Sequence, residues 1–409
     1  MGARPARSTL PAADAPQGKT LNVLALNSGS SSLKFGLYRV GLSQTETMLS
    51  GEAQAIGAHE SRFCAADSRR NELLTEAAPI PSHGAAVIRI GGLLADLGLP
   101  APSAIGHRVV HGGPTLLRHC LLDDSVLRQL EAASAFAPLH TPAALVVIHY
   151  AQAHFPGLPQ VACFDTAFHA ELPEVARTLP IARDLPATGL QRYGFHGLSC
   201  ESIVHQSGAA LPARTVIAHL GNGASVTAVR NGKSIDTSMG LTPTGGVMMG
   251  TRSGDLDPGV LLYLLREKQF DAAMLEDLVD HRSGLLGISG TSSDMRLLHA
   301  AAPTDAAARL AIQMFCYGVR KQVAGMVAAL DGVDLLVFTG GIGENDAEVR
   351  AGICGGLSCV GVRLDAARNR TASNPISTAA ASCAVRVLAS QEDEQIARHT
   401  ATLLASGSA

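Results

Sequence analysis

The sequence contains no tryptophan, and aromatic residues make up only 4% of its 409 positions. Proteins that bind single-stranded nucleic acid stack bases on aromatic side chains, so this scarcity speaks against that class. A strong charge of either sign is also absent. Its 32 basic and 35 acidic side chains leave a net charge of −3, without the basic excess of a nucleic-acid-binding domain. We therefore expect no nucleic-acid partner.

Paired cysteines and long apolar runs are missing as well. The eight cysteines form no C-x-x-C pair, which excludes a zinc ribbon and indicates reduced thiols in a cytoplasmic protein. Residues 1–20 have no apolar core of the kind that a secretory signal needs, and we expect them to form a flexible N-terminal tail. The uncharged stretch 132–164 contains four prolines, so we expect no membrane-spanning helix there.

Length and composition indicate a two-domain α/β protein. A chain of 409 residues exceeds what one hydrophobic core usually supports. Hydrophobic residues account for 46% and charged residues for 16%, which excludes a disordered chain. The 42 glycines and 20 prolines predict many tight turns.

Two segments of the chain share one pattern. An apolar run (21–26), a turn of small polar residues (27–32) and an alternating segment (33–40) predict a β-hairpin. The same order recurs in residues 215–229, which suggests a duplicated architecture with one copy in each domain. Chance similarity between two small-residue turns is the alternative.

The second half of the chain adds three further predicted elements. Apolar residues at three- and four-residue spacing predict a helix over 306–330. A buried strand over 333–339 runs into the glycine-rich segment 340–345, which would place backbone N–H groups at a helix start. Residues 392–404 predict a final amphipathic helix that could pack on either domain.

Three turns of small residues could bind phosphate. Residues 27–32 are followed by Lys34, and further glycines lie at 221–223 and 340–343. Small side chains let the backbone approach a phosphate closely, and an ammonium group neutralises it. For each of the first two turns, taken alone, an ordinary hairpin is the alternative.

Two familiar nucleotide signatures are absent. A P-loop ending at residues 232–234 would need glycine at Thr227, and a dinucleotide fingerprint at 341–346 would need glycine at Asp346. Any nucleotide site must therefore use a different arrangement.

Four charged or titratable residues have unusual surroundings. Arg108 and Arg252 lie in glycine-rich segments, and arginine suits carboxylate and phosphoryl oxygens because its donors form a planar fork. Asp165 follows a predicted strand, and His196 lies between glycines. Exposed loops, for the arginines, and structural polar contacts, for the other two, are the alternative interpretations.

Taken together, these segments resemble the acetate kinase family of short-chain acyl-phosphate-forming kinases, within the actin-like, sugar-kinase and chaperone-ATPase superfamily. The resemblance runs from Leu21 to about Ala401. Its motifs are NSGSSSLK, GHRVVHGG, FDTAFH, RYGFHG, HLGNGAS, SMGLTPTGG with VMMGTRSGDLDP, and FTGGIGEN.

The resemblance implies an α/β fold of two domains with duplicated actin-like, ribonuclease H-like cores and an active-site cleft between them. Residues 21–168 with 388–409 would form the N-terminal domain. Residues 169–387 would form the C-terminal domain, which would bind nucleotide and carry the interface of a homodimer.

The resemblance also implies site residues. Asp165, His196, Arg108 and Arg252 would be catalytic, and Asn27 and Glu392 would hold the metal. The ATP-binding residues would be Ser30, Ser32, Lys34, His219, Leu220, Gly221, Asn222, Gly223, Asp294, Met295, Arg296, Gly341, Ile342, Gly343, Glu344 and Asn345. With Arg108, a small apolar pocket for the acyl methyl group would be formed by Val110, Leu139, Phe195 and Pro243.

The implied activity is reversible, direct in-line transfer of the ATP γ-phosphoryl group to acetate, giving acetyl phosphate and ADP. The metal would be Mg²⁺, or Mn²⁺ in its place. Segment 140–144 lacks two asparagines usual in the family, and residues 244–246 replace a bulkier acidic stretch. Both changes lie near the implied acyl pocket, so a propionate or butyrate kinase on the same scaffold stays open. An actin- or chaperone-type ATPase without an acceptor is the alternative from another class.

Asp165 raises a mechanistic question. A carboxylate acceptor has a pKa of roughly 4, so it is already ionised near neutral pH and needs no proton removed. We therefore hypothesise that Asp165 orients the metal or arginine side chains rather than acting as an obligatory base.

Overall fold

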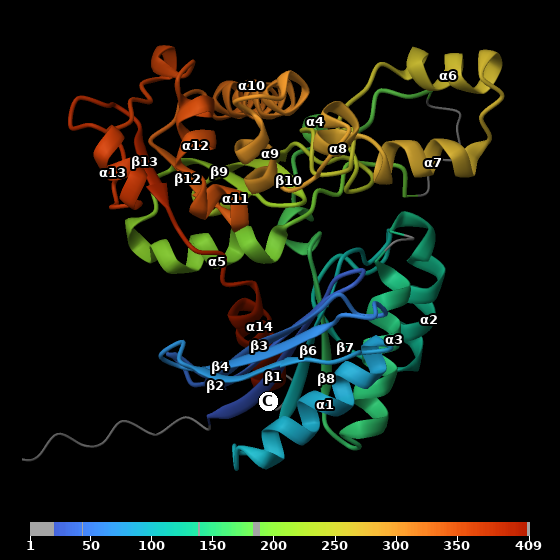
Figure 1. Ribbon diagram of the computed structural model, residues 1–409. Helices are drawn as coiled ribbons and strands as arrows, with labels where there is room; N and C mark the ends of the chain where they lie inside the picture. The colour runs from blue at the N-terminus through green and yellow to red at the C-terminus, as the bar shows by residue number, and fades with distance from the viewer. Residues whose placement is uncertain (1–19, 43, 138–139, 183–188, 407–409) are drawn as a thin grey trace, which may run out of the picture.

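The computed structural model describes residues 20–42, 44–137, 140–182 and 189–406. Apart from Thr20, the predicted N-terminal tail lies outside the described residues. Two β-sheets organise the chain, one above the other in Figure 1, with helices around each. The predicted α/β class is therefore confirmed.

The first sheet has eight strands and the second has five. In spatial order, the strands of the first sheet are β5 (Glu72–Ala77), β4 (Arg62–Asp67), β3 (Thr45–Gln54), β2 (Leu33–Val40), β1 (Leu21–Ser28), β6 (Ala104–Val109), β8 (Gln160–Phe164) and β7 (Cys120–Leu121). Those of the second sheet are β11 (Lys233–Thr237), β10 (Ala224–Arg230), β9 (Arg214–Leu220), β12 (Leu335–Thr339) and β13 (Ala384–Val387).

The two sheets repeat one topology. In the first sheet β1 pairs antiparallel with β2 and parallel with β6, and β6 pairs parallel with β8. In the second sheet β9 pairs antiparallel with β10 and parallel with β12, and β12 pairs parallel with β13. The order β3-β2-β1-β6-β8 thus corresponds to β11-β10-β9-β12-β13. Chance similarity of two turns would not reproduce five strands in order and direction, so the predicted duplication is confirmed.

Helices cover both faces of the first sheet. Leu24 and Leu26 of β1 pack with α1 (His83–Asp96) and α3 (Thr141–His154), whereas Val23 and Ala25 pack with α14 (Glu392–Ser406). Because successive side chains of a strand point to opposite faces, this alternation places α14 on the face opposite α1 and α3. The final helix therefore packs on the first sheet, although the chain reaches it from β13 of the second.

Helix α5 (Gly197–Ser207) lies between the two sheets (Figure 1). Its Leu198 belongs to the apolar cluster that contains β1 and α14, whereas Cys200 and Ile203 pack against β9 and β12. The opposite face of the second sheet is covered by α10 (Ala306–Leu330). Contacts of α5 thus join the two halves of the chain.

The other helices surround these layers. They are α2 (Asp124–Ala132), α4 (Glu174–Arg177), α6 (Pro258–Glu267), α7 (Ala272–His281), α8 (Gly284–Ser289), α9 (Met295–Ala301), α11 (Gly340–Asn345), α12 (Ala347–Cys354) and α13 (Ala366–Thr371), with 3₁₀ turns at Ala133–Phe136, Ala167–His169, Gly208–Ala210 and Ser358–Val360. No helix among the described residues is long and apolar enough to cross a membrane.

The predicted elements of the second half lie close to their expected bounds. The helix predicted over 306–330 is α10, with the same ends, and the final helix extends two residues beyond its predicted end. The strand predicted from 333 begins at Leu335 because Gly332, at φ +114°, still belongs to the turn after α10. The glycine-rich segment 340–345 forms the short helix α11.

Candidate active site

Arg108 and Asp165 form a buried ion pair. Arg108 lies near the end of β6 and Asp165 directly follows β8, so the two parallel strands deliver both side chains to the same sheet edge. Asp165 Oδ2 accepts hydrogen bonds from Arg108 Nε at 2.9 Å and Nη2 at 2.6 Å. Burial raises the pKa of Asp165 to about 6, and the Arg108 guanidinium opposes this rise. Asp165 Oδ1 is buried without a partner among the described residues.

Asn27, at the end of β1, connects this pair to the start of α14. Its Oδ1 accepts from Arg108 at 3.3 Å, and its Nδ2 donates to Glu392 Oε2 at 3.1 Å and Asp393 Oδ1 at 2.8 Å. Burial raises the pKa of Asp393. Burial also tends to raise the pKa of Glu392, but the charges of Arg108, His219 and Lys34 outweigh burial, and the pKa is lowered. Two acidic side chains thus lie near the cations Arg108 and Lys34.

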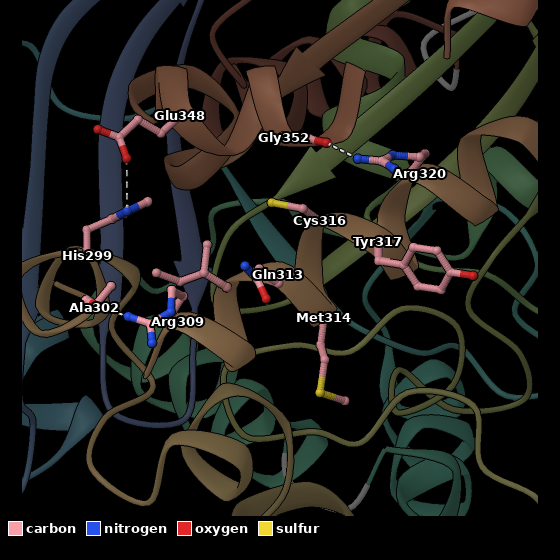
Figure 2. Close-up of a pocket in the computed structure, with 11 residues that line it drawn as sticks. His299, Ala302, Arg309, Gln313, Met314, Cys316, Tyr317, Arg320, Glu348 and Gly352 are labelled. Atoms are coloured by element: carbon pink, nitrogen blue, oxygen red, sulfur yellow. Dashed lines mark hydrogen bonds and ion pairs between the residues drawn. The ribbon is translucent and has the colours of Figure 1, made fainter. Parts of the chain in front are cut away.

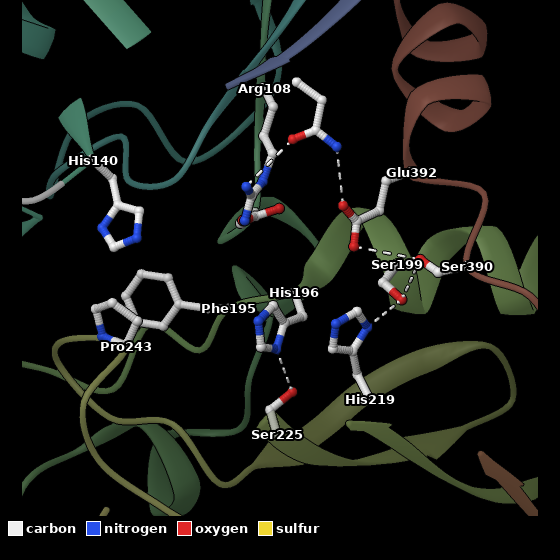
Figure 3. Close-up of polar contacts among 12 residues, drawn as sticks. Arg108, His140, Phe195, His196, Ser199, His219, Ser225, Pro243, Ser390 and Glu392 are labelled. Atoms are coloured by element: carbon white, nitrogen blue, oxygen red, sulfur yellow. Dashed lines mark hydrogen bonds and ion pairs between the residues drawn. The ribbon is translucent and has the colours of Figure 1, made fainter. Parts of the chain in front are cut away.

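His196 and His219 stack on each other, with ring centroids 4.2 Å apart (Figure 3). His196 precedes α5 in a left-handed conformation (φ 58°), and its Nδ1 lies 3.0 Å from Ser225 Oγ. His219 Nδ1 lies 2.8 Å from Ser199 Oγ. Burial, followed by the charges of His219, Arg108 and Arg252, lowers the pKa of His196 well below its usual value. Its ring is therefore neutral near pH 7 and can donate only one hydrogen bond.

Arg252 contacts no carboxylate among the described residues. Its guanidinium lies 3.3 Å from His140 Nε2 and 3.4 Å from the Pro243 carbonyl oxygen. Burial and the charge of Arg108 both lower the pKa of Arg252, opposed by Asp280. The same two arginines and burial lower the pKa of His140 to about 3. A largely buried cation without a counter-ion is suited to bind an anion.

The glycine turns approach one another closely. A Cβ atom at Gly221 would lie 3.8 Å from the amide nitrogen of Gly341, and one at Gly340 would lie 2.8 Å from the Leu220 carbonyl oxygen. Gly340 also has a left-handed φ of 77°. The turn between β9 and β10 therefore lies against the start of α11, and both expose backbone near His219.

The other predicted ATP-binding residues differ in how far they are exposed and in what they contact. Ser30 and Lys34 are exposed, and Ser32 and Gly223 are half-buried. Asn222 lies beside Gly250, whose amide donates to its carbonyl oxygen. The side chains of Leu220 and Met295 are buried in the second core, and Ile342 packs against it. Asp294 caps α9 and pairs with Arg296, with 2.6 Å between the charged atoms.

Glu344 is already engaged by backbone groups. Its Oε1 accepts from the amides of Gly340 and Ser390, each at 2.9 Å. Asn345 Nδ2 donates back to the Gly341 carbonyl oxygen. The glycine-rich segment is thus tied to the chain that leads into α14.

A cavity of about 650 Å³ lies between α9, α10 and α12 (Figure 2). His299, Arg309, Tyr317 and Glu348 are among the residues that line it. None of the predicted ATP-binding residues lines this cavity. It is therefore separate from the cluster around Arg108.

Three of the four predicted acyl-pocket residues belong to the described chain. Val110 and Phe195 are buried in one apolar cluster, and Pro243 offers its carbonyl oxygen to Arg252. Phe195 and Pro243 face each other beside His140 in Figure 3. Leu139 lies outside the described residues. A small apolar wall thus adjoins the arginines.

Sequence reasoning missed several polar residues of this site. Asp393 neighbours Glu392, Ser225 ends the motif HLGNGAS, and Ser199 lies two residues after RYGFHG, yet only the folded chain shows that they hold Asn27, His196 and His219. Proximity to a predicted residue was the available signal for these three. Nothing in the sequence pattern pointed to Ser390, whose hydroxyl lies 2.9 Å from Ser199 Oγ and 3.3 Å from Glu392 Oε1.

The acidic cluster has the ligands that Mg²⁺ or Mn²⁺ would use. Glu392 and Asp393 offer carboxylate oxygens, and Asn27 Oδ1 keeps a second lone pair beside its bond from Arg108. Hard divalent cations prefer oxygen ligands. The unpartnered Oδ1 of Asp165 adds another acceptor that a cation or its water could satisfy. These residues therefore fit such a metal.

Comparison with known proteins gives a consistent result. Residues 22–398 match the model of the acetokinase family. The chain is 42% identical over 400 residues to the acetate kinase of Methylocella silvestris, covering 93% of this chain and 98% of that one. Nitrobacter hamburgensis acetate kinase is 41% identical, with 94% and 96% covered.

Solved structures agree. A propionate kinase from Francisella tularensis superposes with a TM-score of 0.87 at 36% identity, covering 94% of this chain and all of that one. Porphyromonas gingivalis acetate kinase gives a TM-score of 0.82 at 35% identity, with the same coverage. The order of motifs, the duplicated fold and these matches agree, and the chain belongs to the acetokinase family.

Proposed function

We propose that this protein is an acetate kinase that transfers the γ-phosphoryl group of ATP reversibly to acetate. The observation that carries the proposal is the environment of Arg252. Its largely buried guanidinium has no carboxylate partner among the described residues and lies beside Arg108, His196 and a small apolar wall. An actin- or chaperone-type ATPase has no acceptor for which such a site would be needed.

The arrangement suits in-line transfer. One acetate oxygen attacks the γ-phosphorus while the bond to the β,γ-bridging oxygen breaks, which gives acetyl phosphate and ADP. Arg108 and Arg252 stabilise charge on the transferring group, and neutral His196 donates a hydrogen bond to one of its oxygens. No proton has to leave the acceptor, because acetate is ionised near neutral pH.

Asp165 acts by holding Arg108. Both of its hydrogen bonds run from the guanidinium to Oδ2, which fixes the plane of that group. These contacts support an orienting role over that of an obligatory base.

Asn27 and Glu392 would hold Mg²⁺, or Mn²⁺ in its place. When bound, the metal would neutralise charge on the phosphate oxygens of ATP. The turns 27–32 and 221–223 would present backbone amides to the phosphates, and Lys34 and His219 would add polar contacts. Residues 341–345 would adjoin the nucleoside end of ATP. Asp294, Met295 and Arg296 would adjoin the nucleoside end.

Propionate is a second candidate acceptor. It is favoured by the match to a protein described as a propionate kinase and by the small residues Gly245 and Gly246, which follow Pro243 in the sequence. One methylene changes binding by only about 1–3 kcal/mol.

Hydroxylamine trapping of the acyl phosphate, run with acetate, propionate and butyrate, tests both candidates. The highest kcat/KM should fall on acetate. A preference for propionate would reassign the substrate, and turnover of ATP without any trapped product would refute an acyl kinase.

We also propose that the chain forms a homodimer in the cytoplasm through its C-terminal domain, residues 169–387. Neither α6 nor α7, both fully described, has a buried residue. Figure 1 shows the two helices extending away from the second sheet. Val260, Leu262 and Tyr263 of α6 are 44–54% exposed, an apolar surface that a second copy would cover. Tyr263→Asp should then shift the mass in light scattering from dimer to monomer.

We further propose the domain boundaries expected from the sequence, and the packing of the last helix supports this division. The N-terminal domain would comprise residues 21–168 with 388–409, because α14 packs against β1 of the first sheet.

A further inference from the structure

His119, Glu201 and His399 form a cluster apart from the site described above. His399 Nε2 lies 2.7 Å and His119 Nε2 lies 3.7 Å from Glu201 Oε2. The two imidazole rings are 3.9 Å apart between centroids. All three side chains are largely buried, with 11–22% of each exposed. We refer to these three residues as the histidine–glutamate cluster.

The three residues come from three separate segments. His119 precedes β7, Glu201 lies in α5, and His399 lies in α14. Their contacts therefore join the edge of the first sheet, the helix between the sheets and the final helix.

Each of these segments leads to a residue of the candidate active site. His119 Nδ1 accepts the backbone N–H of Phe164 at 3.0 Å, immediately before Asp165. Glu201 lies in the second turn of the helix that begins after His196. His399 lies in the helix whose first residue is Glu392. The cluster thus fixes the spacing of the segments that carry Asp165, His196 and Glu392.

The hydrogen bond from Phe164 also determines the chemistry of the cluster. A neutral imidazole has one lone pair, so a ring whose Nδ1 accepts an N–H carries its proton on Nε2. Metal-binding histidines show the opposite pattern, donating their second N–H to an acceptor. His119 therefore presents an N–H rather than a metal ligand to Glu201.

We propose that Glu201 is a positioning residue for phosphoryl transfer, which holds α5, α14 and the segment before β7 together through His119 and His399. Burial raises the pKa of Glu201, but the contacts of the two histidines outweigh it and lower the pKa to about 2. The carboxylate is therefore ionised throughout the neutral range. The inference rests on the proposed function only for its kinetic consequence, because the contacts themselves do not depend on it.

Steady-state kinetics of Glu201→Gln, His399→Asn and the double variant test the proposal. Misplacing catalytic groups by about 1 Å costs up to about 100-fold in rate, so we expect each single variant to lose about tenfold in kcat. The KM values for ATP and acetate should stay within about twofold. Because His399 acts through its contact with Glu201, the double variant should lose no more kcat than Glu201→Gln alone. His205→Asn is the matched control, since this exposed side chain of α5 makes no hydrogen bond or ion pair with the described chain.

Hydrogen exchange gives a second readout that needs no activity. Amides of residues 197–207 and 390–399 should exchange faster in Glu201→Gln than in His205→Asn. If the wild type forms no acyl phosphate, the proposed function fails, and this exchange still tests the cluster. Unchanged exchange would overturn the proposal.

Two other results would also overturn it. One is a lower denaturation midpoint with unchanged kcat, which would make the cluster merely structural. The other is stoichiometric, micromolar binding of Zn²⁺ that His399→Asn abolishes, which would make it a metal site.

Discussion

Replacement of Arg108 by alanine should lower the free energy of unfolding, because it leaves the buried Asp165 carboxylate without its partner. Arg108 supplies both hydrogen bonds that Asp165 accepts, and the other carboxylate oxygen has no described partner. Removing one member of a buried ion pair typically costs about 3–5 kcal/mol. Asp165 is only 1% exposed, so water cannot replace the lost partner without rearrangement.

The stability difference between the wild type and Arg108→Ala should grow with pH. Without Arg108, the buried Asp165 side chain can avoid carrying an unpaired charge only by binding a proton. Its pKa in the folded wild type is about 6, above the unfolded value near 4, and it should rise further without Arg108. Between the unfolded and the folded pKa, the folded protein holds a proton that the unfolded chain has released. In that range the free energy of unfolding falls by about 1.4 kcal/mol for each unit that the pH rises. In the wild type the free energy of unfolding stops falling near pH 6, the folded pKa of Asp165. In Arg108→Ala it should continue to fall toward pH 8, because the folded pKa is higher. The difference between the two proteins should therefore widen by about 2–3 kcal/mol over that interval.

Urea unfolding followed by circular dichroism at pH 6, 7 and 8 measures this difference, since the chain has no tryptophan to report by fluorescence. The same substitution in an Asp165→Asn background is the control, because that background has no carboxyl to titrate. The reasoning fails if the difference stays constant from pH 6 to pH 8, or if it widens equally in the Asp165→Asn background.

Three further substitutions test the site directly. Arg252→Ala should lower kcat by about 10²–10³ while the ATP dissociation constant from calorimetry changes by less than about threefold, and equal losses in both would remove its transition-state role. Gly250→Ala would place a Cβ 2.2 Å from Asn222 Oδ1, so the Asn222 side chain must move and ATP affinity should fall about tenfold, whereas unchanged affinity would mean that this side chain does not bind the nucleotide. Asp165→Asn should lower kcat by the same factor at every pH from 7 to 9, as an orienting residue requires. A defect that varies across that range and is not relieved by excess Mg²⁺ would instead favour a base.

Much of the fold could be predicted from local patterns in the sequence. The helix over 306–330 follows from apolar spacing and from Asp305, whose side chain caps its first turn. The two hairpins follow from apolar strands around turns of small residues. The packing partner of α14 does not follow from local pattern, because its apolar face is compatible with either sheet, and only the family resemblance assigned it to the first domain, where it packs on β1.

The residues of the site were predicted mainly from the resemblance to a known family, and less from physical reasoning about the local sequence. Arg108 and Asp165 are 57 positions apart, and only the pairing of β6 with β8 brings them together. The engagement of Glu344 by two backbone amides could not be foreseen either, because it depends on where residue 390 passes the start of α11. Local sequence indicates which residues are chemically suitable, whereas their partners depend on distant segments.

The central claim is that separate segments converge on the terminal phosphate of ATP beside a pocket for a few carbons. A crystal structure with Mg²⁺, a non-hydrolysable ATP analogue and acetate tests it most directly. The account predicts that the guanidinium groups of Arg108 and Arg252 lie within hydrogen-bond distance of the γ-phosphate or the acetate carboxylate. A γ-phosphate bound away from both arginines would contradict it.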